Sequence, residues 1–270
     1  MKVVVIGSQG MAGWMITDYL RKQGCHVREI NRNHINIEDV KVTSQYFKNT
    51  VFQTYDYIIN CAGILINHAN AHPDKAILVN SWFPKFLEKY TEDKPTKVIH
   101  LSTDCVFDGL EGPYTELDLH TERNYYGITK SLGELNNCKD LTIRTSIIGP
   151  EKKNTGSGLL NWVLTSQEKE LQGWANHHWN GITTLQLAKC IFAYMQTPKI
   201  SGIYHVVNND VKINKYDLLC KINKIYNLQK NIKFVTHKTC VNKVLIDTRC
   251  EFNFNIPDYD VQLTDLKEYS

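Results

Sequence analysis

The sequence of 270 residues predicts an α/β protein with a doubly wound parallel sheet and a smaller α/β part. Over residues 1–150, short apolar runs rich in β-branched residues alternate with helical patterns, as expected for buried parallel strands joined by crossover helices. The first run, Lys2–Ile6, is followed at once by a glycine-rich turn and an amphipathic stretch. We therefore expect a first domain over residues 1–150 and a smaller region over residues 151–270.

Each expected element follows from its residue pattern. In the first domain we expect strands at Lys2–Ile6, Cys25–Ile30, Tyr55–Ile59, Lys97–Leu101 and Leu141–Thr145, and helices at Trp14–Lys22, at Asp74–Tyr90 and around Tyr126. In the second region we expect helices at Gly156–Glu168, Thr184–Gln196 and Asn214–Tyr226, a strand at Gly202–Val207 and a short extended segment at Ile232–Val235. Ligands of such open sheets bind in a crevice outside the carboxyl ends of the strands.

Composition and charge argue against several classes of protein. The formal net charge is only +3, and no run of Lys and Arg is of the nucleic-acid-binding type. No apolar stretch is long enough to span a bilayer, and the first apolar run is too short for a signal peptide. The 8 cysteines are dispersed without a Cys-x-x-Cys pair, which indicates reduced thiols and a cytoplasmic location. We expect no metal site, because the side chains of the adjacent His177 and His178 diverge and no carboxylate or Cys is spaced to join them.

The turn after the first strand reads Gly7-Ser8-Gln9-Gly10-Met11-Ala12-Gly13. A glycine turn between a strand and a helix lets a pyrophosphate approach the backbone at the helix N-terminus, where free N–H groups and the helix dipole favour negative charge. The Gly-x-x-Gly-x-x-Gly spacing alone also fits a simple tight turn, but its place at the start of a βαβ unit indicates a Rossmann-type dinucleotide site. The candidate cofactor contacts in this turn are Gly7, Gln9, Gly10, Met11 and Gly13.

The choice of cofactor should depend on the end of the second strand. An acidic residue there would bind the ribose 2′-OH of NADH, whereas an Arg would suit the 2′-phosphate of NADPH. Asn31 and Arg32 follow the strand, and Glu29 lies within it. We therefore expect NADPH, with contacts from Asn31 and Arg32. NADH remains the alternative, because a shift of two residues would bring Glu29 to the strand end.

Tyr126 and Lys130 are the candidate catalytic pair. Residues four apart on a helix share a face, so the phenol and the ammonium should be neighbours. A nearby cation favours the phenolate and lowers the pKa of a Tyr, which then serves as an acid or base near neutral pH. Ser102 and Thr103 end the strand before this helix, and either hydroxyl could hold a carbonyl oxygen. The pattern indicates reduction of a ketone or oxidation of an alcohol by hydride transfer.

Three further segments resemble a known family. They are Ser102-Thr103-Asp104-Cys105-Val106-Phe107-Asp108-Gly109, Pro113-Tyr114-Thr115-Glu116, and Tyr126-Gly127-Ile128-Thr129-Lys130 with Gly133-Glu134. Together with Arg144-Thr145-Ser146 and Gly181–Leu185, they look like the extended short-chain dehydrogenase/reductases, and within them the dTDP-4-dehydrorhamnose reductases and related nucleotide-sugar reductases. The resemblance is strongest from Met1 to Pro150.

The resemblance implies roles for the matching residues. Tyr126 would donate a proton to the keto oxygen, and Lys130 would lower the pKa of Tyr126 and hydrogen-bond the nicotinamide ribose. Thr103 would be the hydroxyl partner, with Ser102 as second choice. Tyr125 is the rival phenol, but it lies off the Lys130 face of the helix. Further cofactor contacts are expected at Cys61, Ala62, Gly63 and Asn80, and substrate contacts at Asp104, Val106 and Trp179.

The implied function is reduction of the 4-keto group of a nucleotide-linked 6-deoxy sugar by NADPH, in the biosynthesis of activated deoxysugars. The second region would hold the nucleotide-sugar, with some of its elements returning to the first domain. This chain has Ile147-Ile148 where many of these reductases carry Trp, so the sugar pocket is expected to differ. One alternative is a nucleotide-sugar epimerase or dehydratase, but Cys105 after Asp104 removes the second carboxylate of a dehydratase. The other is a silent nucleotide-binding regulatory subunit. We also expect that the chain can form a homodimer.

Overall fold

The computed structural model describes residues 1–50, 52, 54–152, 158–197, 199–209, 211–252 and 254–269. Its centre is a six-stranded sheet in the order β10–β5–β4–β3–β1–β2, in which all neighbouring strands are parallel. The strands are β1 (Lys2–Ile6), β2 (His26–Ile30), β3 (Tyr57–Asn60), β4 (Lys97–Leu101), β5 (Leu141–Arg144) and β10 (Gly202–His205). The direction in which strands are added reverses at β1, so ligands are expected at the carboxyl ends of β1 and β3.

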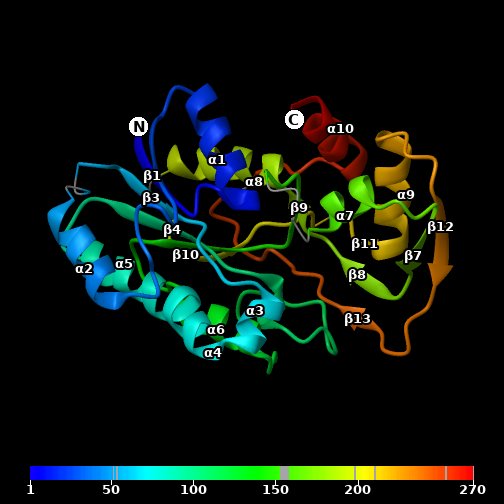
Figure 1. Ribbon diagram of the computed structural model, residues 1–270, viewed down its shortest axis with the longest axis horizontal. Helices are drawn as coiled ribbons and strands as arrows, with labels where there is room; N and C mark the ends of the chain where they lie inside the picture. Colours follow the sequence, from blue (N-terminus) through cyan, green and yellow to red (C-terminus); the bar gives the residue numbers. More distant parts are fainter. Residues whose placement is uncertain are drawn as a thin grey trace.

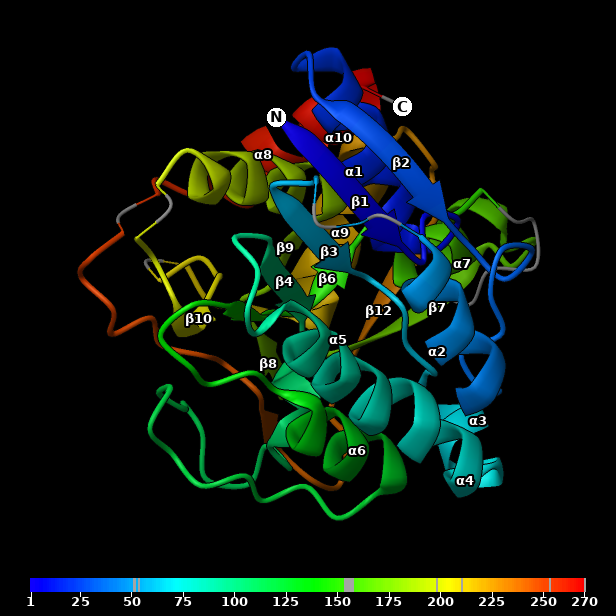
Figure 2. The same ribbon diagram turned by 90° about the vertical axis from the view of Figure 1, so that its left-hand side faces the viewer.

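Helices cover both faces of this sheet (Figure 1). One face carries α1 (Met11–Lys22), α8 (Thr184–Met195) and α10 (Tyr259–Tyr269), and the other carries α2 (Val40–Asn49), α5 (Phe83–Thr91) and α6 (Tyr125–Gly133). Successive side chains of β1 point to opposite faces. Val5 therefore joins the apolar cluster that contains Met15 of α1, and Val4 joins the cluster that contains Phe47 of α2. Figure 2 shows the same two layers from the side.

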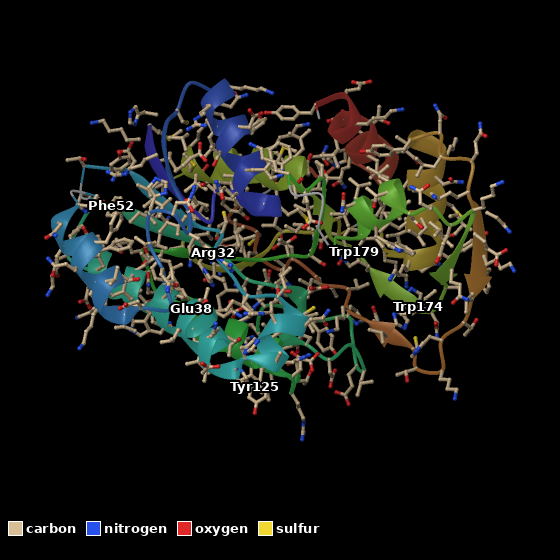
Figure 3. All side chains as sticks on the ribbon, viewed as in Figure 1. Arg32, Glu38, Phe52, Tyr125, Trp174 and Trp179 are labelled. Carbon is tan, nitrogen blue, oxygen red and sulfur yellow. The ribbon has the colours of Figure 1, made fainter. Side chains whose placement is uncertain are left out.

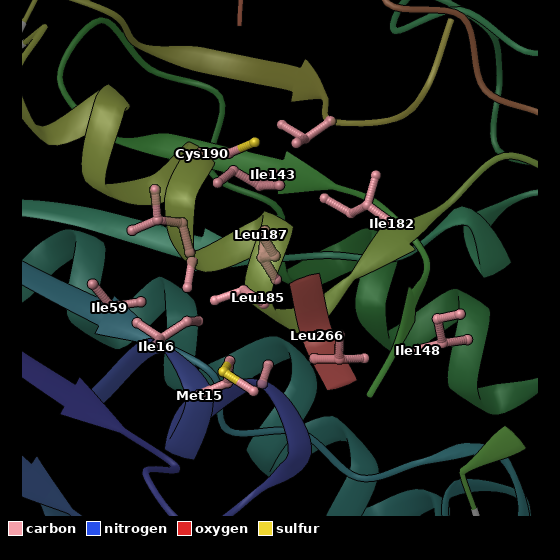
Figure 4. Packing of buried hydrophobic residues seen from close by; sticks show 14 of the residues in the cluster. Met15, Ile16, Ile59, Ile143, Ile148, Ile182, Leu185, Leu187, Cys190 and Leu266 are labelled. Carbon is pink, nitrogen blue, oxygen red and sulfur yellow. The ribbon is translucent and has the colours of Figure 1, made fainter. Parts of the chain in front are cut away.

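The packing of α1 fixes the position of its N-terminus. Ile16 of α1 lies beside Ile59 of β3 and Leu185 of α8 in Figure 4, and all three side chains are buried. Burial of each such side chain contributes about 2 kcal/mol to stability. The glycine turn that leads into α1 is thereby held at the carboxyl edge of the sheet.

The smaller part is built from short elements on one side of the main sheet (Figure 1). Strand β7 (Glu170–Trp174) pairs with β12 (Asn231–Val235), and β8 (His177–Trp179) lies between β11 (Ile213–Asn214) and β13 (Val241–Asn242). Strand β6 (Ile147–Ile148) pairs with β9 (Ile182–Thr183). The helices of this part are α7 (Leu159–Thr165) and α9 (Lys215–Ile225). From the second half of the chain, β10 joins the central sheet and α8 packs on its face, while α10 packs against α8, α9 and β9.

Most expected elements form, and the differences have physical causes. The helix expected at Asp74–Tyr90 is continuous but begins at Pro73 as α4 (Pro73–Ala76), passes through the π-helical turn η1 (Ile77–Trp82) and continues as α5. A further helix, α3 (Ile66–Ala71), precedes it. The helix expected at Gly156–Glu168 is shorter, since α7 ends at Thr165; Gly156 itself lies outside the described residues.

Two elements of the second region were not predicted from the sequence. His177 to Trp179 form strand β8, because β11 and β13 supply backbone partners that are distant in the sequence. The C-terminal helix α10 was not anticipated, although its buried residues Leu263 and Leu266 are spaced for a helix face. Within the described ranges, no helix is both long and apolar enough to cross a membrane.

Candidate functional site

The glycine turn brings three backbone segments into close approach. Gly7 has φ +79°, and a Cβ there would lie 2.8 Å from the backbone nitrogen of Ala62. A Cβ on Gly13 would lie 2.2 Å from the Gly7 carbonyl oxygen. Gly10 caps the N-terminus of α1, and its N–H donates to the Gly7 carbonyl at 3.0 Å. Only glycine at positions 7 and 13 allows this approach, which leaves the start of α1 open to an anion.

A cavity of about 460 Å³ extends from this turn along the carboxyl edge of β1, β2 and β3. Nine of the predicted cofactor contacts line it together: Gly7, Gln9, Gly10, Met11, Asn31, Arg32, Cys61, Ala62 and Gly63. The sequence reasoning missed other lining residues, among them Asn33, Asn36, Glu38, Val79, Glu151 and Lys152. Asn33, Asn36 and Glu38 lie in the loop after β2, so extending the predicted site beyond Arg32 along this loop would have included them. Glu151 and Lys152 reach the cavity only through the tertiary fold.

Four predicted cofactor contacts are absent from the lining of this cavity: Gly13, Asn80 and the catalytic candidates Tyr126 and Lys130, which are described below. Gly13 lies in the first turn of α1, where it packs on Gly7. Asn80 is buried on η1; its amide accepts from the Ile64 N–H at 2.8 Å and donates to the Ile64 carbonyl at 3.0 Å and to the Thr129 hydroxyl at 3.1 Å. Asn80 therefore ties the loop after β3 to α6, and any effect on a cofactor would pass through that loop.

The end of β2 presents Arg32 to the cavity. Arg32 is exposed, and no hydrogen bond or ion pair of its side chain occurs among the described residues (Figure 3). Glu29 lies inside β2, opposite Val5, and pairs with Arg21 at 2.7 Å. The Asn31 side-chain oxygen accepts from the Asn33 N–H at 2.9 Å and shapes the turn. Arg32 is thus the cation available for an anionic group at this end.

The catalytic candidates come together at the carboxyl end of β4. Tyr126 and Lys130 lie on one face of α6, which begins after Asn124. The Thr103 hydroxyl lies near enough to the phenol of Tyr126 to lower its pKa. The Lys130 ammonium is buried and donates to the Leu101 carbonyl at 2.5 Å. Tyr125 is 49% exposed and points outward at the lower edge of Figure 3, which argues against it as the reacting phenol.

The two strand-end hydroxyls have different partners. The Ser102 hydroxyl donates to Glu134 Oε1 at 2.6 Å, so it is engaged away from Tyr126. The Thr103 hydroxyl contacts Tyr126 and also donates to Asp104 Oδ1 at 3.1 Å. The geometry therefore favours Thr103 over Ser102 as the partner of the phenol.

The charge states correct one expectation. Burial raises the pKa of Tyr126 above 10, with Cys105 and Asp104 adding to this effect and the Thr103 hydrogen bond opposing it. Burial also lowers the pKa of Lys130 to about 8, against the opposing influence of Glu134 and Cys61. The expected lowering of the Tyr126 pKa by Lys130 is therefore not observed: Lys130 is not among the groups that shift this pKa, and desolvation of the phenolate raises it. A phenol with a raised pKa is protonated at neutral pH and can act as a proton donor.

A buried ion pair lies behind the catalytic residues. Arg144 on β5 donates to both carboxylate oxygens of Glu134 at 2.7 Å, and both residues are buried. Arg144 also contacts a ring nitrogen of His120 at 2.7 Å. This pair anchors Glu134 at the end of α6, beside Ser102. The sequence contained both residues in the resembling segments, but nothing in their spacing predicted their contact.

The remaining candidates are packed more tightly than expected. Val106 is fully buried in an apolar cluster with Phe107 and Leu245, so its side chain is not open to a ligand. Asp104 is buried, and burial raises the pKa of its carboxyl despite the charge of Lys243 and hydrogen bonds from neighbouring side chains. Trp179 stacks on Tyr259, with ring centres 5.7 Å apart.

The two thiols near the candidate site, Cys61 and Cys105, are not activated. Burial raises the pKa of the thiols of Cys61 and Cys105 to about 12 each, so both are protonated at neutral pH. In the part of the chain that the structure describes, no group of three or more His, Cys, Asp or Glu side chains could hold a metal ion.

The chain is similar to several known proteins. The dTDP-4-dehydrorhamnose reductase of Salmonella typhimurium is 27% identical over 224 residues, which cover 77% of this chain and 72% of the relative. The methionine adenosyltransferase 2 subunit beta of Xenopus tropicalis is 24% identical over 252 residues, which cover 84% and 72%. Among solved structures, a dTDP-4-dehydrorhamnose reductase from Bacillus anthracis in complex with NADP is similar in fold. Its TM-score is 0.85 at 20% identity, and the match covers 100% of this chain and 99% of that chain.

The family assignment rests on a longer match. The family model described as the RmlD substrate binding domain matches residues 1–245, which is most of the chain. The chain therefore belongs to the RmlD substrate binding domain family.

Proposed function

We propose that the protein uses NADPH to reduce the 4-keto group of a nucleotide-linked 6-deoxyhexulose, in the manner of a dTDP-4-dehydrorhamnose reductase. The observation that carries the proposal is the contact between a protonated Tyr126 and Thr103, next to a dinucleotide-sized cavity. Family membership and the named activity of the Salmonella typhimurium relative support the same reaction.

The cavity suits a phosphorylated dinucleotide. The glycine turn, where a Cβ on Gly7 would meet Ala62, forms a backbone cradle for the pyrophosphate at the start of α1. Arg32 suits the 2′-phosphate, since a guanidinium binds phosphate with several parallel hydrogen bonds. NADPH supplies the hydride when it is bound. The complex of the Bacillus anthracis structure with NADP supports this choice of cofactor.

The residues around the keto group handle its oxygen. Tyr126 donates its phenolic proton to the oxygen as negative charge develops there, and the Thr103 hydroxyl stabilises the same oxygen. Lys130, largely protonated at pH 7, stabilises the phenolate that Tyr126 leaves behind. Together, Tyr126, Thr103 and Lys130 stabilise the negative charge that develops on the keto oxygen and then on the phenolate.

Two alternatives receive less support. The Xenopus tropicalis relative is named as a subunit, which keeps the silent subunit as an alternative, but such a protein has no need of Tyr126 and a buried Lys130 near Thr103. A dehydratase needs further acid–base groups, and Cys105, protonated at neutral pH, takes the place of a second carboxylate.

The direct test is oxidation of NADPH and NADH with a panel of dTDP-, UDP- and GDP-linked 4-keto-6-deoxy sugars. We expect turnover with NADPH and at least one of these sugars. Tight cofactor binding without turnover across the panel would instead favour the silent subunit.

A further inference from the structure

Residues Pro150 and Lys152, which follow β6, lie against the start of α1. The indole nitrogen of Trp14 donates to the Pro150 carbonyl at 2.9 Å, which fixes Pro150 against α1. The Gly158 N–H donates to Glu151 Oε2 at 2.7 Å, and a Cβ on Gly158 would lie 2.8 Å from Cε of Met11. Residues separated by well over a hundred positions are thus held together at the pyrophosphate end of the cavity.

Lys152 carries a cation to this place. Its ammonium lies 5.3 Å from the centre of the Trp14 ring, and Lys152 lines the cavity that also contains Gly10 and Met11. The first turn of α1 contains no acidic residue. No ion pair of Lys152 occurs among the described residues, whereas the neighbouring Glu151 carboxylate is bound to a backbone N–H. The Lys152 charge also acts on the Asp18 carboxylate of α1, but Asp18 is paired with Lys22 at 3.0 Å. The Lys152 ammonium therefore remains available beside a helix N-terminus that favours anions.

We propose that Lys152 is a second cationic contact of the dinucleotide and binds its pyrophosphate, at the opposite end of the cavity from Arg32. The proposal depends on the proposed function only in requiring a dinucleotide ligand. It assigns a separate task to each cation: Arg32 distinguishes NADPH from NADH, and Lys152 contributes equally to both, because both contain the pyrophosphate.

The test is direct binding, measured by calorimetry without any sugar substrate. The ligands are NADPH, NADH, ADP-ribose and adenosine 2′-phosphate, and the proteins are wild type, Lys152→Ala, Lys152→Arg and Arg32→Ala. We expect Lys152→Ala to weaken NADPH, NADH and ADP-ribose each by about fivefold, as for a partly exposed ionic contact, and to leave adenosine 2′-phosphate unchanged. Lys152→Arg should stay within about twofold of wild type, because the charge is kept. Arg32→Ala should show the reverse pattern, weakening only the ligands with a 2′-phosphate.

Two results would overturn the proposal. A loss confined to NADPH and adenosine 2′-phosphate would assign Lys152 to the adenosine end, and equal affinities for Lys152→Ala and wild type would make it a solvated lysine. Absence of dinucleotide binding by the wild type would instead refute the proposed function itself, so the two failures are distinguishable.

Discussion

Substitution of Glu134 tests how the neighbouring charges set the pKa of Lys130. The substitution Glu134→Gln removes a negative charge near the Lys130 ammonium but keeps an oxygen that can accept from Ser102 and Arg144. In the wild type, burial lowers the pKa of Lys130 to about 8, and Glu134 is the strongest of the groups that oppose this shift. Without the carboxylate, the pKa of Lys130 should fall further.

The size of the effect follows from these charges. A pKa of about 8 leaves roughly nine-tenths of Lys130 protonated at pH 7 and about half at pH 8. Removing one adjacent opposite charge lowers a pKa by about one unit. In Glu134→Gln, about half of Lys130 would then be protonated at pH 7 and about a tenth at pH 8. Turnover that needs the ammonium should fall about twofold at pH 7 and about fivefold at pH 8.

The assay is kcat/KM for the keto sugar from pH 6 to pH 9.5, in wild type and Glu134→Gln. In Glu134→Gln, we expect the fall in kcat/KM on the alkaline side of the pH profile to move by about one pH unit to lower pH. Ser102→Ala is the matched control: it removes the hydrogen bond to Glu134 at 2.6 Å but keeps the carboxylate, so this fall should stay in place. Thermal unfolding establishes that each variant is folded at the assay temperature, because weakening the buried Arg144 pair is destabilising. An unshifted fall in kcat/KM in a folded Glu134→Gln would refute the reasoning.

Three other changes test separate parts of the site. Arg32→Ala should lower the preference for NADPH over NADH in kcat/KM by about tenfold, through loss of a charged phosphate contact; an unchanged ratio would place the 2′-phosphate elsewhere. Gly13→Ala should abolish dinucleotide binding in calorimetry, because the new Cβ would lie 2.2 Å from the Gly7 carbonyl oxygen; wild-type affinity would mean that the turn can shift freely. The pKa of Lys130 is depressed from 10.5 to about 8. Between these two pH values the unfolded state therefore binds more protons than the folded state. As a result, the free energy of unfolding rises with pH across this range and falls as the pH is lowered. Urea unfolding at pH 8 and pH 10 should therefore show a smaller rise in the free energy of unfolding for Lys130→Met than for wild type, and equal rises would contradict the buried charge.

Local patterns predicted the parts of the site that depend on neighbours in the sequence. The glycine turn lies between β1 and α1 because strand and helix periodicities adjoin there, and Tyr126 and Lys130 share a face because four residues separate them on α6. The strand order could also be expected, since βαβ units connect in one hand. These features require no knowledge of distant contacts.

The remaining features depend on contacts between distant segments. Lys152 reaches the glycine turn only because Trp14 binds Pro150, and Glu134 meets Arg144 only when β5 lies next to β4. The pKa of Tyr126 was predicted in the wrong direction for the same reason. Helix spacing placed Lys130 on the same face of α6 as Tyr126, but the desolvation that decides the shift is a property of the whole fold.

The most direct measurement is the loss of reduced-nicotinamide absorbance with NADPH and a dTDP-linked 4-keto-6-deoxy sugar, for wild type and Tyr126→Phe side by side. We predict that the wild type oxidises NADPH in step with formation of the reduced sugar. We predict that Tyr126→Phe is slower by about two to four orders of magnitude, as expected for loss of a general acid, while it still binds NADPH. Turnover by Tyr126→Phe within severalfold of wild type would contradict the assignment of Tyr126 as the proton donor.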